Sequence, residues 1–120
     1  MGSNGMKTTI RGKQAETAVA EELSRNGYEI IAQNWKTKVC EIDIIAQKGK
    51  IIYFVEVKFR AQATQGSGLE YIGPQKLHKI HFAASIWTQC NNWEGDYRLL
   101  AASVTTDGMD YIIEEILELE

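Results

Sequence analysis

Residues 41–58 read EIDIIAQKGKIIYFVEVK, two apolar runs separated by a short polar turn. The pair Gly49-Lys50 fits a two-residue hairpin turn with glycine first. Because residues alternate between the two faces of a strand, this turn sets which residues of the two runs lie opposite each other. It places Asp43 opposite Glu56. Two carboxylates facing each other destabilise a strand pair, so the sequence predicts a cation between them.

The predicted site is a metal centre for phosphodiester hydrolysis. Mg²⁺ prefers oxygen ligands and takes only one or two protein carboxylates, which Asp43 and Glu56 supply, with the Val57 carbonyl as a third ligand. Lys58 lies opposite Glu41 in this register and is assigned to the attacking water or the phosphate. The alternative is that the same charged residues form the solvated face of a hairpin. The apolar residues on that face would then be exposed, which favours the site.

A third acid lies on a predicted helix over residues 11–26. Glu16 falls among the apolar positions Val19, Ala20 and Leu23 of that helix, on the stripe expected to face the sheet. A carboxylate there is costly to bury without a positive partner. Two interpretations remain open: Glu16 orients or completes the metal site, or it reaches water at the edge of the sheet.

The remaining pattern predicts a mixed sheet with helices packed on its faces. Gly and Pro residues mark a loop over 61–73 and the start of a second helix over 74–90. Segment 111–120 fits a helix as well as a strand. Besides 41–47 and 51–58, strands are predicted over 28–35 and 97–104, the last buried on both faces.

Composition is that of one globular domain, with 44% hydrophobic and 24% charged residues. Residues 1–6 are interpreted as an expression scar and 7–120 as a single domain, expected in the cytoplasm. The net charge of −3 is unevenly distributed, because residues 1–82 hold 12 Lys and Arg against 8 Asp and Glu. This basic part permits a phosphate-facing surface, whereas the simpler interpretation is a solvated acidic C-terminus.

Several motifs together resemble the YraN-type family of uncharacterised, endonuclease-like proteins over residues 11–104. They are Glu16, Asn34-Trp35, the EIDIIA and FVEVKFR segments, and Glu70, Pro74 and Lys76 at the second helix. That family is similar to the PD-(D/E)xK nuclease superfamily, including archaeal Holliday-junction resolvases. The resemblance implies a restriction-endonuclease-like αβββαβ core with catalytic positions at Asp43, Glu56 and Lys58, and Glu16 as the helix-borne acid. Two departures are Ile42 in place of proline and Cys40 in place of glycine.

The sequence thus predicts a DNA endonuclease dependent on Mg²⁺ or Mn²⁺, with branched or single-stranded DNA as its partner. Arg60, Lys76 and Lys79 are the predicted phosphate contacts. One alternative is a binding module that grips nucleic acid or a protein without cutting. Another is an interaction protein that forms a homodimer through Phe82 and Ile86. His78 and His81 are assigned to exposed surface rather than to zinc, and Cys40 and Cys90 to reduced thiols.

Overall fold

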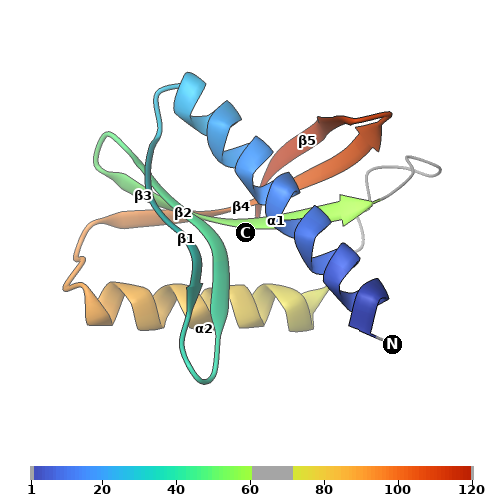
Figure 1. Ribbon diagram of the computed structural model, residues 1–120. Coiled ribbons are helices and arrows are strands. Elements are labelled where there is room, and N and C mark those ends of the chain that lie inside the picture. Colours follow the sequence, from blue (N-terminus) through green and yellow to red (C-terminus); the bar gives the residue numbers. More distant parts are fainter. Residues whose placement is uncertain (1, 61–71, 120) are drawn as a thin grey trace.

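The computed structural model of the chain describes residues 2–60 and 72–119. Its elements, shown in Figure 1, are α1 (Gly2–Arg25), β1 (Glu29–Lys36), β2 (Glu41–Lys48), β3 (Ile51–Arg60), α2 (Pro74–Cys90), β4 (Asp96–Asp107) and β5 (Asp110–Leu119). The predicted αβββαβ core is confirmed, and the ambiguous C-terminal segment is a strand. The first helix begins at Gly2, within the segment interpreted as an expression scar. Residues 61–71 of the predicted loop lie outside the described residues.

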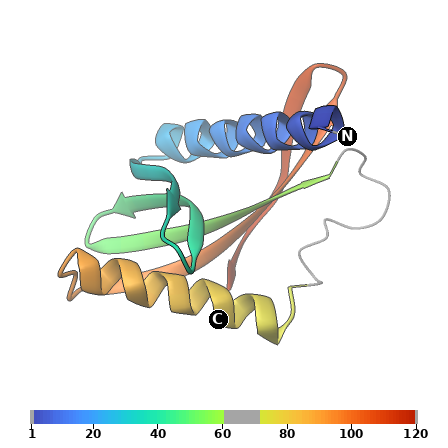
Figure 2. The same cartoon turned by 60° about the horizontal axis from the view of Figure 1, so that its bottom comes forward.

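The strands form one mixed sheet in the order β1-β2-β3-β4-β5. The β3–β4 pair is parallel, with α2 as its crossover, and the other three pairs are antiparallel. Figure 2 shows α1 and α2 on opposite sides of this sheet. Neither helix, over the residues described, is long and apolar enough to cross a membrane.

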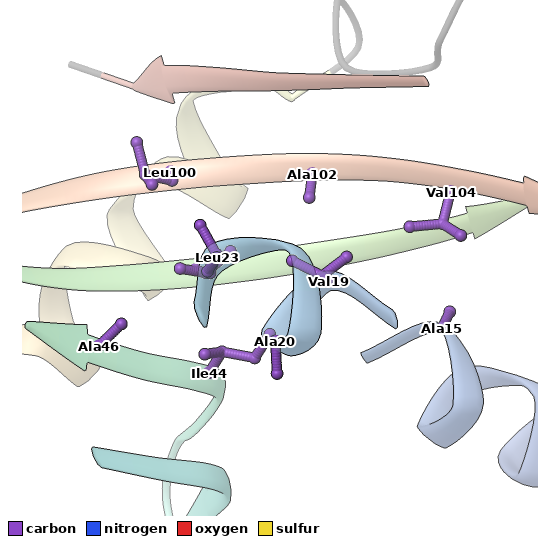
Figure 3. Packing of buried hydrophobic residues seen from close by; sticks show 10 residues of the cluster. Ala15, Val19, Ala20, Leu23, Ile44, Ala46, Leu100, Ala102 and Val104 are labelled. Atoms are coloured by element: carbon purple, nitrogen blue, oxygen red, sulfur yellow. The ribbon is translucent and has the colours of Figure 1, made fainter. Parts of the chain in front are cut away.

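Small and branched side chains of α1 pack on one face of the sheet, as Figure 3 shows. Ala15, Val19, Ala20 and Leu23 are almost fully buried, so the predicted apolar stripe of α1 does face the sheet. Alanines on this stripe leave room for the helix to lie close to the strands. The sheet residues beneath are Ile44, Ala46, Val55, Leu100, Ala102 and Val104.

The opposite face of the sheet packs against α2 around one aromatic side chain. Phe54 is fully buried and makes edge-to-face contacts with Trp87 of α2 and Tyr97 of β4, at centroid distances of 5.6 and 5.4 Å. Residues 99–105 of β4 are all buried, as the continuous apolar run predicted. The two cores therefore enclose β2, β3 and β4 between the two helices.

The β2–β3 hairpin has the predicted register over only part of its length. Gly49 has a φ of 62°, and Lys48 pairs with Ile51 to close the two-residue turn. The pairing continues to Ile44 and Val55 and then stops. The predicted pairs of Asp43 with Glu56 and of Glu41 with Lys58 are therefore absent from this ladder. The physical reason is the Asp43 side chain itself, which takes a backbone hydrogen bond from β3.

Candidate active site

Asp43 lies where β2 separates from β3. Its Oδ2 atom accepts a hydrogen bond from the Val57 N–H at 2.8 Å, so a side chain replaces the strand pairing at this point. The alternation of β2 also changes here, because Ile44 packs in the core under α1 whereas Ile42 packs in the core under α2. The Asp43 carboxylate is thus accessible to groups from both sides of the sheet.

Glu16 reaches this carboxylate from the α1 side. Its side chain shares a hydrogen bond with Asp43 and accepts another from the Asn34 amide. A hydrogen bond between two carboxyl groups requires a shared proton. The Glu16 Oε1 atom is buried and has no hydrogen-bond partner among the residues described. Glu16 is therefore part of the acidic site, and its remaining oxygen can still accept a proton or a cation.

Asn34 has an unusual backbone that explains its contact with Glu16. Its φ is 54°, in the left-handed region that Asn adopts more readily than most other residues. Its neighbours Gln33 and Trp35 pair with Ile44 and Ile42, so Asn34 lies across from Asp43. The sequence resemblance included Asn34, but no role was predicted for it. Asn34 follows Gln33 in a strand whose residues are half polar, so its polarity alone did not distinguish it.

The carboxyl groups of the site have raised pKa values. Burial raises the pKa of Asp43 from 3.8 to about 6, the Val57 N–H opposes the rise, and the neighbouring Glu16 adds to it. Burial also raises the pKa of Glu56, and the negative charge of Asp43 contributes. For Glu16, burial raises the pKa although its hydrogen bonds from Asp43 and Asn34 oppose it. Burial is thus the main cause of the raised pKa values, and the charges of the neighbouring acids add to it.

Lys76 supplies the positive charge closest to these acids. Its Nζ lies 2.8 Å from Glu56 Oε2. Partial burial acts to lower the pKa of Lys76, but the hydrogen bond and charge of Glu56, with Asp43 and Glu41, raise it overall. Pro74 at the first turn of α2 brings Lys76 to this position. Lys76, which was predicted as a phosphate contact, forms this ion pair with Glu56, a predicted metal ligand.

The other predicted cations are placed differently. Lys58 follows Glu56 by two residues on β3 and is exposed. The Arg60 guanidinium donates to Glu114 at 3.0 Å, and the Ser103 hydroxyl donates to the same carboxylate at 2.9 Å. Arg60 is therefore tied to β5 through Glu114. Lys79 of α2 faces a cleft beside them.

This cleft of about 530 Å³ lies between α2 and the turn that joins β1 to β2. Figure 1 shows that turn extending across α2. Residues 36–41 form one wall, and Lys76, Lys79 and Phe82 belong to the α2 wall. Asp43 and Glu56 line the cleft as well. The turn was not predicted as part of the site. Its lysines are visible in the sequence, but only the tertiary structure shows that α2 lies opposite them.

Cys40 and Cys90 are free thiols, as predicted. His78 is exposed, as predicted, and lines the cleft, whereas His81 is half-buried and not exposed as predicted. Within residues 2–60 and 72–119, no three His, Cys, Asp or Glu side chains are grouped closely enough to form a metal-ligand set by themselves. Mg²⁺ commonly takes only one or two protein carboxylates and completes its coordination with water, so it does not require such a set.

Comparison with known proteins identifies the family of this chain. The model of the uncharacterised protein family UPF0102 matches residues 15–112, which is most of the chain. The chain belongs to UPF0102. A UPF0102 protein of Vibrio campbellii is 37% identical over 102 residues, covering 82% of this chain and 84% of that protein. One from Fusobacterium nucleatum is 34% identical over 111 residues, covering 92% and 88%.

The UPF0102 match includes every side chain that forms the site. Glu16, Asn34, Asp43, Glu56 and Lys76 all lie between residues 15 and 112. The family resemblance inferred from the motifs is thereby confirmed. Most of β5 lies beyond the match, so the site belongs to the part of the fold that UPF0102 proteins share.

Proposed function

We propose that this UPF0102 protein is an endonuclease that hydrolyses DNA phosphodiester bonds with Mg²⁺ or Mn²⁺. The observation that carries the proposal is the Asp43 carboxylate in the opening between β2 and β3, with Glu16 on one side and Glu56 nearby. Acids held together with raised pKa values are typical of catalytic and metal-binding sites. A cation would offset the repulsion among them.

The donor set fits a hard divalent cation. Asp43 and Glu56 offer carboxylate oxygens, the Val57 carbonyl is the proposed third ligand, and the buried Oε1 of Glu16 still lacks a partner among the described residues. When bound, Mg²⁺ or Mn²⁺ would neutralise charge on the scissile phosphate and acidify a water molecule.

The chain's own residues have separate tasks in this proposal. Asn34 holds Glu16, and Glu16 in turn fixes the orientation of the Asp43 carboxylate. Lys58, on the face that it shares with Glu56, would stabilise negative charge on the phosphate. Lys76 balances the charge of Glu56 in the metal-free protein.

The Lys76–Glu56 ion pair also favours a second candidate function. A carboxylate already neutralised by a lysine does not need a metal, so the same fold could bind DNA without cutting it. The two functions differ in whether a divalent cation displaces Lys76 from Glu56.

Replacing Lys76 by methionine tests this displacement. We expect Lys76→Met to bind Mn²⁺ about fivefold more tightly than the wild type, because the metal no longer competes with an ammonium group for Glu56. Isothermal titration calorimetry with MnCl₂ measures the affinity, and Lys79→Met is the matched control. Equal affinities in all three proteins would contradict the competition, and no binding by the wild type would contradict the metal centre.

Cleavage tests the activity itself. We expect the wild type to cut branched, nicked or single-stranded DNA with Mn²⁺ but not with EDTA. Glu56→Gln and Lys58→Met should each reduce the rate by about 100-fold or more, because each removes charge from the reacting phosphate or its metal. Lys50→Met, on the opposite end of the β2–β3 hairpin, serves as the control. Binding without cutting on all substrates would support the second function instead.

A further inference from the structure

The cleft is lined by lysines on both walls and by the carboxylates of Glu41, Asp43 and Glu56. Lys36 and Lys38 come from the β1–β2 turn, and Lys76 and Lys79 come from α2. These residues lie in a chain whose net charge is −3, so the positive charge of the walls is local. Phosphates are attracted to such walls, and a phosphate inside the cleft would lie next to Asp43 and Glu56.

The turn wall is held in shape by its own hydrogen bonds. The Thr37 Oγ1 atom accepts from the N–H groups of Val39 and Cys40, both at 3.1 Å. The Thr37 N–H donates to the Cys40 carbonyl at 2.8 Å. The lysines on either side of Thr37 are therefore presented by a defined turn, which lowers the entropic cost of binding a ligand.

Two exposed apolar side chains belong to the same cleft. Val39 is 73% exposed on the turn, and Phe82 is 44% exposed on α2. Both line the cleft, one from each wall. Apolar and aromatic surface next to lysines is the combination found in grooves for single-stranded nucleic acid, where bases stack while cations contact the backbone. A groove that binds only the phosphate backbone of a duplex does not require apolar side chains such as Val39 and Phe82.

The size of the cleft limits what can enter it. A volume of about 530 Å³ is within the range of pockets for single small ligands, roughly 300–1,000 Å³. It accommodates about one or two nucleotides, whereas a duplex is too wide. A base inside it must therefore be unpaired.

We infer that this cleft binds an unpaired segment of single-stranded DNA, with its phosphates on Lys36, Lys38 and Lys79 and a base against Phe82 and Val39. The inference rests on the proposed function for the choice of DNA. It adds that a substrate must present unpaired nucleotides next to the scissile phosphate. Such segments occur at branches, flaps and single-stranded ends.

Binding to a fluorescein-labelled dT₁₂ oligonucleotide in EDTA tests the inference without any cleavage. Fluorescence anisotropy should show that Lys38→Glu weakens binding at least tenfold, whereas Lys50→Glu changes it less than twofold. Both lysines are exposed on hairpin turns, but Lys50 does not line the cleft. The salt dependence of binding should also decrease in Lys38→Glu only.

Phe82→Ala tests the apolar part of the cleft. We expect about fivefold or greater weakening of dT₁₂ binding, because a stacked base loses its aromatic partner. Met109→Ala, a similar loss of exposed apolar surface on the β4–β5 turn, should have no effect. The same measurement with a U₁₂ oligonucleotide distinguishes DNA from RNA as the ligand. A 12-base-pair DNA duplex should bind at least tenfold more weakly than dT₁₂.

Three results would overturn the inference: equal weakening by Lys38→Glu and Lys50→Glu, duplex binding as strong as dT₁₂ binding, or U₁₂ binding tighter than dT₁₂ binding. The failure of the proposed function looks different. If cleavage is lost in Glu56→Gln while the cleft variants bind normally, the nuclease stands and the cleft assignment falls. If the cleft variants lose dT₁₂ binding and no protein cuts, the cleft stands and the nuclease falls.

Discussion

Asp43→Asn is expected to abolish metal-dependent cleavage and, at the same time, to stabilise the protein at neutral pH. Asparagine keeps the shape of the side chain and can still accept from the Val57 N–H and donate to Glu16. It removes the negative charge that the divalent cation would bind, so cleavage should fall by about 100-fold or more. The Asp43 carboxylate, the proposed metal ligand, thus lowers the stability of the metal-free fold at neutral pH.

The pKa of Asp43 explains why Asp43→Asn should increase the free energy of unfolding at neutral pH. Burial raises the pKa of Asp43 to about 6 in the folded protein, above its ordinary value of 3.8. A raised pKa means that the folded state holds the proton more tightly than the unfolded state. The resulting stability is present below about pH 4 and is lost as the pH rises through about 6. The difference corresponds to about 2–3 kcal/mol.

Urea denaturation from pH 4 to pH 8 measures the effect. The free energy of unfolding of Asp43→Asn minus that of the wild type should increase between pH 4 and pH 6, reaching about 2 kcal/mol at pH 7.5. Saturating Mn²⁺ should reduce this difference, because the cation stabilises only the wild type. At a Mn²⁺ concentration of 100 times the dissociation constant, this stabilisation is about 2.7 kcal/mol. A variant that is less stable than the wild type at pH 7.5 would contradict the assignment.

Phe54→Ala is expected to cause the largest loss of stability, about 3–5 kcal/mol. Phe54 is fully buried between Trp87 and Tyr97, so its removal leaves a cavity where α2 packs on the sheet. The α2 helix carries Lys76 and one wall of the cleft, and both depend on this packing. We therefore expect weaker dT₁₂ binding before the protein unfolds globally.

Phe82→Ala provides the matched control, since it makes the same substitution at a half-exposed position of α2. Its free energy of unfolding should change by less than about 0.5 kcal/mol. The midpoint of urea denaturation, followed by tryptophan fluorescence, compares the two variants. Equal effects would mean that Phe54 does not hold α2 on the sheet.

Much of the fold was predictable from local patterns. The apolar stripe of α1, the glycine-first turn at Gly49 and the buried run of β4 each follow from side-chain periodicity or turn chemistry, which act over a few residues. Pro74 likewise marks the first residue of α2. The strand character of residues 110–119 was not predictable in this way. Pairing with β4 decides it, and that pairing is a long-range contact.

Local sequence patterns predicted the acidic residues of the candidate site, but they did not predict the partners of its lysine and arginine residues. Strand alternation and helix periodicity indicated Asp43, Glu56 and Glu16. The opening of the sheet at Asp43 was not indicated, because it depends on a hydrogen bond from β3. The partner of Arg60 was equally hidden, since Glu114 lies on a strand that follows much later in the chain.

The sequence by itself determined which elements form and which family the chain resembles, because these depend on short-range spacing. It indicated Asp43 and Glu56 on adjacent strands and left the role of Glu16 open. Only the tertiary structure decided that Lys76 contacts Glu56, that Asn34 holds Glu16, and that the β1–β2 turn faces α2 across a cleft. The physical reason is that long flexible cations take their partners from whichever elements pack beside them. Packing between distant segments is set by the whole core, and no local pattern records it.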